Sequence, residues 1–257
     1  MTTRVFKFGG RAQGAAALPE LITAAAQRAR VVVVHGGGDE VSAMQRRLGM
    51  EPQFVGGRRV TSEADLEVVR MLLSGSVNKR LVAQLATAGA RAVGISGEDG
   101  GLLSARVTDA TFGRVGRDVR ANPALLEDLL ASGWLPVVSP LARDRDSREG
   151  LGLNVNGDDA ATAIAVALRA DELCFVADVD GVLEAGQRIP RLDPAGIQDL
   201  AARGVAQGGM LAKLEAAVAA LEAGVGAIRI GTLELLQDPQ AGTTIVPAVS
   251  ASSRNTP

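Results

Sequence analysis

The sequence predicts an α/β fold built on a mainly parallel β-sheet, and three features lead to this prediction. Residues 31–34 are four consecutive valines. Such a run has no polar face, so it is typical of a strand buried on both sides. The run leads into Gly36, Gly37 and Gly38, and a segment with helical spacing follows. A strand at 4–8 and an alanine-rich helix at 15–30 come before it, which gives a β–α–β unit with a right-handed crossover.

The rest of the chain continues this alternation of apolar strands and helices. Thr61 or Ser62 with Asp65 is typical of a helix start, and the helix that follows covers 66–88, with Gly75 as its weak point. Further strands are expected at 92–96, 135–139, 173–177 and 227–230, and further helices at 40–48, 123–132, 160–168 and 210–223. Residues 189–204 are expected to form a loop and a helix.

Two segments are less regular. Residues 108–120 are expected to form exposed strands or a hairpin, with Phe112 and Val115 as anchors that point inward. Residues 242–246 are expected to add a strand at the edge of the sheet. A soft boundary near 170–177 divides the chain into an N-terminal lobe, 1–172, and a C-terminal lobe, 173–257.

The composition excludes several classes of protein. The chain has 257 residues, a formal net charge of −2, 47% hydrophobic residues and no tyrosine. Without a basic run or an aromatic platform, a nucleic-acid partner is not expected. No signal peptide and no apolar stretch of about 20 residues occur, so a membrane span is not expected. Cys174, the only cysteine, lies in an apolar run and is expected to be a small buried side chain, which favours a cytoplasmic location.

The triple glycine marks a candidate anion site. A buried strand, a glycine turn and a helix N-terminus together present free backbone N–H groups at the carboxyl edge of a sheet, where open α/β folds bind anions. Glycine lets a ligand approach the backbone closely. A plain tight turn would need the same glycines. His35, just before them, is expected to have a structural hydrogen-bonding role.

Two lysines stand where a positive charge is unfavourable unless a negatively charged group lies nearby. Lys7 interrupts the apolar strand 4–8 directly before a glycine pair. It is either a lysine on an edge strand whose ammonium group reaches solvent, or a lysine that faces a phosphate, and the second strand ending in glycine favours the phosphate. Lys213 lies in the first turn of a helix, where its charge opposes the helix dipole. A bound phosphate would offset that cost.

Polar residues follow two further apolar segments. Asn154, Asn156, Asp158 and Asp159 precede an alanine-rich helix, although a single cap residue would suffice there. Arginines at 58 and 59 follow a pair of glycines. They either form a solvated surface or grip a carboxylate with two hydrogen bonds.

The inventory of side chains excludes other chemistry. No Gly-x-Ser-x-Gly segment occurs, and one histidine with one cysteine cannot make a Cys/His metal site. The P-loop and Gly-x-Gly-x-x-Gly patterns are also absent. What remains is phosphoryl transfer by positioning and charge stabilisation, which needs cations and backbone N–H groups.

The motifs, taken in order, resemble the amino-acid kinase family. They are Lys7-Phe8-Gly9-Gly10, His35-Gly36-Gly37-Gly38, Gly57-Arg58-Arg59-Val60-Thr61, Val77-Asn78-Lys79, Gly97-Glu98-Asp99-Gly100, Asn154-Val155-Asn156-Gly157-Asp158, Asp178-Val179-Asp180-Gly181-Val182-Leu183, and Gly208-Gly209-Met210 with Lys213. The resemblance runs from residue 4 to about residue 246. It implies a three-layer α/β/α sandwich, a homodimer formed through the N-terminal lobe, ATP with Mg²⁺ as the donor, and a carboxylate as the acceptor. Within the family the chain is most similar to the branch that phosphorylates the side-chain carboxylate of N-acetyl-L-glutamate in arginine biosynthesis.

The resemblance also implies roles for residues at matching positions. Lys7 and Lys213 would stabilise charge on the transferring phosphoryl group, and Asp158 would orient both lysines. The N-terminal lobe would bind the acceptor and the C-terminal lobe the nucleotide, with no protein side chain binding a metal. The acceptor would be held by Gly37, Gly38, Arg59 and Asn154. The nucleotide would contact Gly9, Gly10, Asp178, Val179, Asp180, Gly181, Val182, Leu183, Val205, Ala206 and Gln207.

Some expectations stay open at this stage. Arg58 duplicates Arg59, which is favoured for the acceptor because it stands just before Val60 and Thr61. Asp39 adds a negative charge beside the anion site. Lys7 lies too near the start for the extra N-terminal helix of arginine-inhibited relatives, so a dimer without that control is expected. The alternatives are a kinase of carrier-protein-linked aminoadipate or glutamate, for which Arg58 and Arg117 could face the carrier, and a non-catalytic nucleotide or amino-acid sensor.

Overall fold

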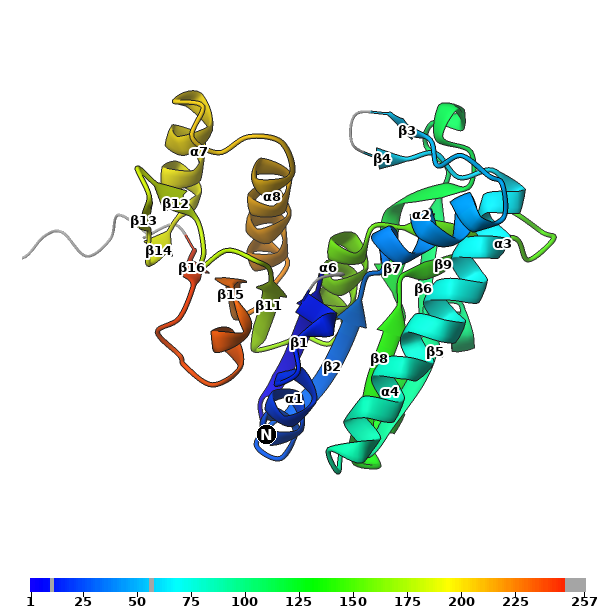
Figure 1. The fold of residues 1–257 in the computed structure, drawn as a ribbon. Helices are drawn as coiled ribbons and strands as arrows, with labels where there is room; N and C mark the ends of the chain where they lie inside the picture. Colours follow the sequence, from blue (N-terminus) through cyan, green and yellow to red (C-terminus); the bar gives the residue numbers. More distant parts are fainter. Residues whose placement is uncertain (10–11, 56–57, 248–257) are drawn as a thin grey trace, which may run out of the picture.

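The chain folds around an eight-stranded sheet (Figure 1). The computed structural model describes residues 1–9, 12–55 and 58–247. In spatial order the strands are β14 (Arg191–Leu192), β16 (Thr243–Ile245), β15 (Ala227–Gly231), β11 (Glu172–Val176), β1 (Thr3–Phe8), β2 (Arg30–His35), β8 (Leu135–Ser139) and β5 (Ala92–Ser96). Six of these strands are parallel, and β16 and β14 run against them. The sheet is therefore mainly parallel, as the sequence predicts.

Helices cover both faces, which makes the predicted three-layer sandwich. Alternate residues of the central strands enter different cores, because successive side chains point to opposite faces. Val5 of β1 packs on one face with α5 (Ala124–Ala131), α6 (Gly157–Ala167), α7 (Pro194–Ala202) and α8 (Gly208–Glu222). Phe6 and Phe8 pack on the other face with α1 (Leu18–Ala26) and α4 (Asn78–Thr87). Lys7 shares the parity of Val5 and therefore faces α6.

The predicted helix over 66–88 is part of one longer helical segment with an unusual centre. It consists of α3 (Glu63–Arg70), a π-helical stretch η2 (Met71–Val77) and α4. Ser62 and Asp65 form the reciprocal capping box that the sequence predicts. Gly75 lies inside the π-helical stretch. π-Helical turns are uncommon and frequently lie at functional sites.

A second, smaller sheet of four strands closes on itself beside the main one. Its strands follow the order β10 (Gly152–Val155), β7 (Val115–Ala121), β6 (Leu103–Arg106) and β9 (Leu141–Asp144). The predicted strand in 108–120 is thus paired on both sides. The prediction of Phe112 and Val115 as inward anchors is wrong, since both are only half-buried and line a cavity.

The remaining elements are short, and one prediction about them is corrected. They are α2 (Gly38–Arg47), the hairpin β3 (Phe54–Val55) and β4 (Arg58–Arg59), the hairpin β12 (Leu183–Glu184) and β13 (Gln187–Arg188), and the 3₁₀ turns at Ala12–Gly14, Asp99–Gly101, Ala110–Phe112 and Leu233–Leu236. The strand predicted at the sheet edge, β16, lies between β15 and β14 instead. The two-residue strand β14 was too short to be predicted from an apolar pattern.

The sheet is continuous across the predicted lobe boundary, because β11 pairs with β1 over five register positions. The division into lobes 1–172 and 173–257 stays a prediction. Within the described residues, no helix is long and apolar enough to cross a membrane.

Candidate active site

The predicted site residues gather at the carboxyl edge of three neighbouring strands. Phe8 at the end of β1 is in register with His35 of β2 on one side and Val176 of β11 on the other. The motif residues that follow each strand therefore meet at one edge, as is usual for ligand sites of open α/β sheets. Because β1 lies in the centre of the sheet, the alternative of Lys7 as an edge-strand lysine is wrong.

Asp158 joins the two lysines. The Nζ atom of Lys7 lies 2.8 Å from Oδ1 of Asp158, and Lys213 donates a hydrogen bond to the other carboxylate oxygen, Oδ2. All three side chains are at least four-fifths buried. One carboxylate thus holds two ammonium groups from different elements, β1 and α8. This is the arrangement expected for Lys7, Asp158 and Lys213.

The charges in this cluster are strongly coupled. Burial alone would raise the pKa of Asp158, but the charges of Lys7 and Lys213 outweigh it and hold that pKa below its usual value. Burial lowers the pKa of Lys213; Asp158 opposes this and Lys7 adds to it. The Nζ atom of Lys213 also lies 4.6 Å from the centre of the Phe175 ring, a cation–π contact. Asp158 is therefore an ionised positioning group, and the cluster carries one net positive charge.

Glycine at the start of α6 lets Lys7 reach the helix. A Cβ atom on Gly157 would lie 3.1 Å from Cε of Lys7. The side chain of Asn156 caps the helix by accepting a hydrogen bond of 2.7 Å from the N–H of Asp158. Lys7 thus packs against the first turn of α6, directly below Asp158. Gly9 follows β1 and has space around it, with only the carbonyl of Val176 within 4.0 Å of an added Cβ. Gly10 lies outside the described residues.

The triple glycine starts α2 without a side-chain cap. The N-cap residue is Gly37, and the N–H groups of the first turn receive no side-chain hydrogen bond. Gly37 has φ +148°, and an added Cβ would lie 2.7 Å from Cδ2 of Leu73 in the π-helical stretch, so glycine is needed there. A Cβ atom added to Gly38 would have no other atom within 4 Å. A helix start without a side-chain cap, beside space that an added Cβ would not fill, is what the predicted anion site requires.

His35 supports this turn from the interior, as expected. Its ring is fully buried; Nδ1 lies 2.9 Å from the carbonyl oxygen of Gly36, and Nε2 lies 3.1 Å from the amide nitrogen of Asn78. The same amide donates to the carbonyl of Val137, 2.9 Å away. Since Nδ1 faces a carbonyl, Nδ1 carries the hydrogen and Nε2 accepts. Burial lowers the pKa of His35 to about 4, so the ring is neutral.

Arg59 is held against the first turns of α2. Its guanidinium donates to the carbonyl of Gly38 (2.8 Å), to Oγ of Ser42 (2.6 Å) and to Oε1 of Gln45 (2.5 Å). It also lies 4.8 Å from the centre of the Phe54 ring. Burial lowers the pKa of Arg59 within a range where the group stays charged. The side chain of Arg58 lies outside the described residues, so the choice between the two arginines stays a prediction.

Asn154 is connected to the segment that carries Arg59 by a hydrogen bond to Thr61. Its side-chain amide donates to Oγ1 of Thr61, 3.1 Å away, and Thr61 is fully buried. Ser42 and Gln45 were missed in the sequence, and Thr61 was noted only as a possible helix start and as part of a motif, not as a partner of Asn154. Positions 38, 42 and 45 lie on one face of α2, and this spacing could have indicated which residues meet Arg59.

The turn after β11 carries the predicted nucleotide residues. The hydroxyl of Thr243 accepts a 2.8 Å hydrogen bond from the N–H of Val182, and Gly181 adopts φ +142° against this threonine. The turn is thereby tied to β16. The other members are Asp178, Val179, Asp180 and Leu183, which are all exposed. The side chain of Val182 itself is buried in the core, so only its backbone can face a ligand.

The predicted nucleotide residues before α8 also include both exposed and buried side chains. Val205 is 40% exposed, whereas the side chain of Ala206 is buried. Gln207 stands at the N-cap, but its side chain donates to the carbonyl of Gly204 and does not cap α8. Like α2, this helix begins with glycine and has no side-chain cap. Within the described residues, no cluster of three His, Cys, Asp or Glu side chains could hold a metal. Burial raises the pKa of Cys174, which is fully buried and cannot act as a nucleophile.

Comparison with known proteins identifies the family of this chain. The model of the amino acid kinase family matches residues 2–232. Acetylglutamate kinase of Chloroflexus aurantiacus is 45% identical over 211 residues, which cover 81% of this chain and 82% of the relative. Acetylglutamate kinase of Methanopyrus kandleri is 48% identical over 214 residues, 79% of this chain and 86% of the relative.

Solved structures share the fold. A crystal structure from Streptococcus mutans has a TM-score of 0.83 and 31% identity, covering 95% of this chain and 98% of that one. N-acetylglutamate synthase of Neisseria gonorrhoeae, complexed with coenzyme A and N-acetyl-glutamate, has a TM-score of 0.81 and 28% identity, covering 97% of this chain and 60% of the synthase. The chain belongs to the amino acid kinase family.

Proposed function

We propose that this chain transfers the γ-phosphoryl group of ATP to the side-chain carboxylate of N-acetyl-L-glutamate and so makes an acyl phosphate for arginine biosynthesis. The observation that carries the proposal is the bridge from Lys7 through Asp158 to Lys213. Two buried ammonium groups fixed on one carboxylate suit a reaction in which negative charge builds up on a phosphoryl group. The names of the curated relatives support the acceptor.

The chemistry needs positioning more than proton transfer. A side-chain carboxylate is already ionised near neutral pH, so its oxygen can attack the γ-phosphorus without a general base. As the new O–P bond forms, the bond from phosphorus to the bridging oxygen breaks and ADP leaves with the electron pair. Lys7 and Lys213 would stabilise the equatorial oxygens. Asp158 would keep the two ammonium groups, which repel one another, at a fixed separation.

The acceptor would lie between α2 and the start of β10. The uncapped N–H groups of Gly37 and Gly38 would bind the carboxylate that attacks. Arg59 would hold the other carboxylate with a charge-assisted hydrogen bond from its remaining N–H groups. The side chain of Asn154 would hold the amide end of the acceptor. Three hydrogen bonds from Arg59 to α2 support this role, because they fix the guanidinium before substrate arrives.

The nucleotide would lie over the other half of the sheet edge. The exposed apolar side chains of Val179, Leu183 and Val205 could contact the purine, and the free N–H groups of α8 could bind phosphate. Mg²⁺ would enter with the ATP phosphates. We further propose that residues 1–172 bind the acceptor and residues 173–257 the nucleotide, and that the protein is a cytoplasmic homodimer.

A hydroxylamine trapping assay tests the proposal. Purified protein is incubated with ATP, Mg²⁺, N-acetyl-L-glutamate and hydroxylamine, and hydroxamate is measured. An ATP-dependent signal is expected with the wild-type protein, and a signal reduced at least about 100-fold with Asp158→Asn. If ATP binds but no hydroxamate forms, the acceptor assignment is wrong. A carrier-linked acceptor or a sensor then becomes the better hypothesis.

A further inference from the structure

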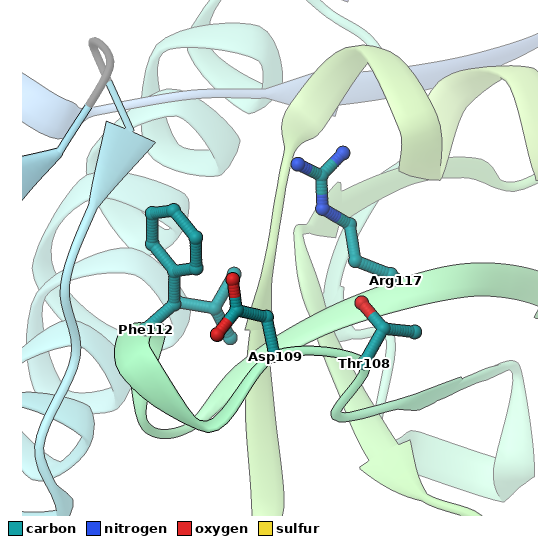
Figure 2. Close-up of a pocket in the computed structure, with 5 residues that line it drawn as sticks. Thr108, Asp109, Phe112 and Arg117 are labelled. Carbon is teal, nitrogen blue, oxygen red and sulfur yellow. The ribbon is translucent and has the colours of Figure 1, made fainter.

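A cavity lies beside the proposed acceptor site and has no role in the mechanism above. Its volume is about 460 Å³, and it is lined by Thr108, Asp109, Phe112, Val115 and Arg117 (Figure 2). The volume falls within the ~300–1,000 Å³ of small-molecule sites. None of these five residues belongs to the cluster of Lys7, Asp158 and Lys213. An acetyl group would fill only a small part of such a space.

Register and hydrogen bonds place this cavity next to the amide end of the acceptor. Val115 of β7 is the register partner of Asn154 in β10, and paired residues of neighbouring strands point to the same face. The carbonyl of Phe112 accepts a 2.9 Å hydrogen bond from the N–H of Thr61. Thr61 in turn accepts the hydrogen bond from Asn154. The cavity therefore adjoins Asn154 through Val115 and Phe112, although Asn154 itself does not line it.

One wall of the cavity carries a cation without a protein partner. Arg117 lies two residues beyond Val115 on β7, about 7 Å further along the same face. Among the residues that the structure describes, none makes a hydrogen bond or ion pair with its half-buried guanidinium. Its register partner on β6 is Arg106, a second guanidinium. The guanidinium of Arg106 is paired with Asp146, 3.4 Å away, so Arg117 is the cation of this pair that a bound anion could neutralise.

The other wall of the cavity carries apolar side chains and a carboxylate. Phe112 and Asp109 lie on one side of the cavity, whereas Arg117 and Thr108 lie on the other (Figure 2). Asp109 also lines the cavity; its carboxylate is exposed and accepts a hydrogen bond of 2.9 Å from the N–H of Thr111. Phe112 and Val115 supply apolar surface between Asn154 and Arg117. The cavity thus runs from an amide contact along apolar side chains to a cation.

We propose that this cavity is a second part of the acceptor site and binds an N-acyl group that ends in a carboxylate, such as succinyl. Arg117 binds that terminal carboxylate, and Phe112 and Val115 contact the methylene carbons. Phosphoryl transfer itself takes place at the same glutamate side chain. The proposal rests on the proposed function, since it needs a glutamate whose nitrogen is acylated.

Three acceptors and two variants test it. N-acetyl-, N-succinyl- and N-butyryl-L-glutamate are compared by kcat/KM in the hydroxamate assay; butyryl matches succinyl in length but lacks the carboxylate. Wild-type protein is expected to prefer succinyl to butyryl by roughly tenfold or more, since a charge-assisted contact to Arg117 is made only with succinyl. Arg117→Leu is expected to abolish that preference. Arg120→Leu is the matched control, because Arg120 lies on the same strand but is 67% exposed and pairs with Asp118.

The outcomes separate the two proposals. If no acceptor is phosphorylated, the proposed function fails. If N-acetyl-L-glutamate reacts but succinyl and butyryl acceptors are used equally, the cavity is not a carboxylate subsite. If the preference for succinyl survives Arg117→Leu, or is lost equally in Arg120→Leu, Arg117 is not the group that binds the carboxylate.

Discussion

His35 and Asn78 are joined by a hydrogen bond of 3.1 Å in the interior, although 43 residues separate them in the chain. The bond connects the glycine turn after β2 with the first residue of α4. Because Asn78 also donates to Val137 and accepts from Lys79, its side-chain hydrogen-bonding groups are fully used. The turn that presents Gly37 and Gly38 is therefore fixed from behind by a neutral imidazole.

This neutral imidazole predicts how stability depends on pH. Burial lowers the pKa of His35 from 6.5 to about 4, so between these values the unfolded chain binds a proton that the folded chain does not. Unfolding is then favoured as pH falls from 6.5 to 4, and His35 alone would cost up to about 3 kcal/mol of stability over that range. Denaturant unfolding of wild type and His35→Gln at several pH values measures this. The variant should show a shallower dependence, and identical slopes would contradict the assignment.

Changes to the Lys7–Asp158–Lys213 cluster should lower turnover without weakening the binding of ATP. The chain has only three lysines beside 24 arginines, and two of them contact Asp158. Lysine is a compact point charge, whereas arginine is a wide planar fork, so Lys213→Arg should not restore the geometry. We expect Lys213→Arg and Asp158→Ala to lower kcat by roughly 100-fold or more and to change the Kd for ATP much less. Rapid-quench turnover and calorimetric ATP titration check this; unchanged turnover in both variants would remove the mechanism.

Two neighbouring glycines predict opposite effects. Gly37→Ala meets Leu73 and adopts a positive φ, so it should lower the free energy of unfolding by roughly 2–4 kcal/mol. Gly38→Ala adds a methyl group in open space at a helix start, so it should keep or raise stability. That methyl group would nevertheless occupy space proposed for the acceptor, and KM for N-acetyl-L-glutamate should rise. Thermal unfolding and steady-state kinetics of both variants separate the effects. Normal kinetics in Gly38→Ala would place the acceptor elsewhere.

The sequence predicted the layers of the fold better than their edges. Val31 to Val34 and the apolar runs at 135–139 and 173–177 are long enough to identify central strands, because burial on both faces leaves a continuous apolar signal. The strand β14 has two residues and no such signal, and for that reason β16 was placed at the edge. The π-helical stretch also has no sequence signature beyond Gly75, since its pattern of apolar residues is compatible with an α-helix.

Some residues of the candidate site were also predictable from the sequence, and others were not. Lys7 and Asp158 were recognisable because a charge in an apolar strand, or more polar residues than a helix cap needs, suggests a partner. Lys213 was also recognised, but its predicted place in a first helix turn is wrong, since α8 begins at Gly208 and Lys213 lies in the second turn. The contact of Phe175 with Lys213 was hidden, since phenylalanine in a buried strand also satisfies ordinary packing. Arg117 was named only as a basic residue that could face a carrier protein. Its lack of a partner depends on the register of β6 and β7, which no local pattern specifies.

Arg59 predicts a selective effect on the acceptor. Its guanidinium is fixed by Gly38, Ser42 and Gln45, and these bonds leave it pointing along the start of α2. Lysine keeps the charge but lacks the planar group of donors that makes these three bonds, so it would not hold the acceptor carboxylate in the same place. We expect Arg59→Lys to raise KM for N-acetyl-L-glutamate roughly tenfold or more, with little change in KM for ATP.

Arg47→Lys provides the matched control, because Arg47 ends the same helix α2 and is exposed. Ser42→Ala should produce a smaller rise in KM than Arg59→Lys, since it removes one of the bonds that orient the guanidinium but leaves the guanidinium in place. Equal KM values for the acceptor in Arg59→Lys and wild type would mean that Arg59 only braces α2 against the hairpin of β3 and β4. The grip on the acceptor carboxylate would then fall to Arg58, the other arginine of that hairpin.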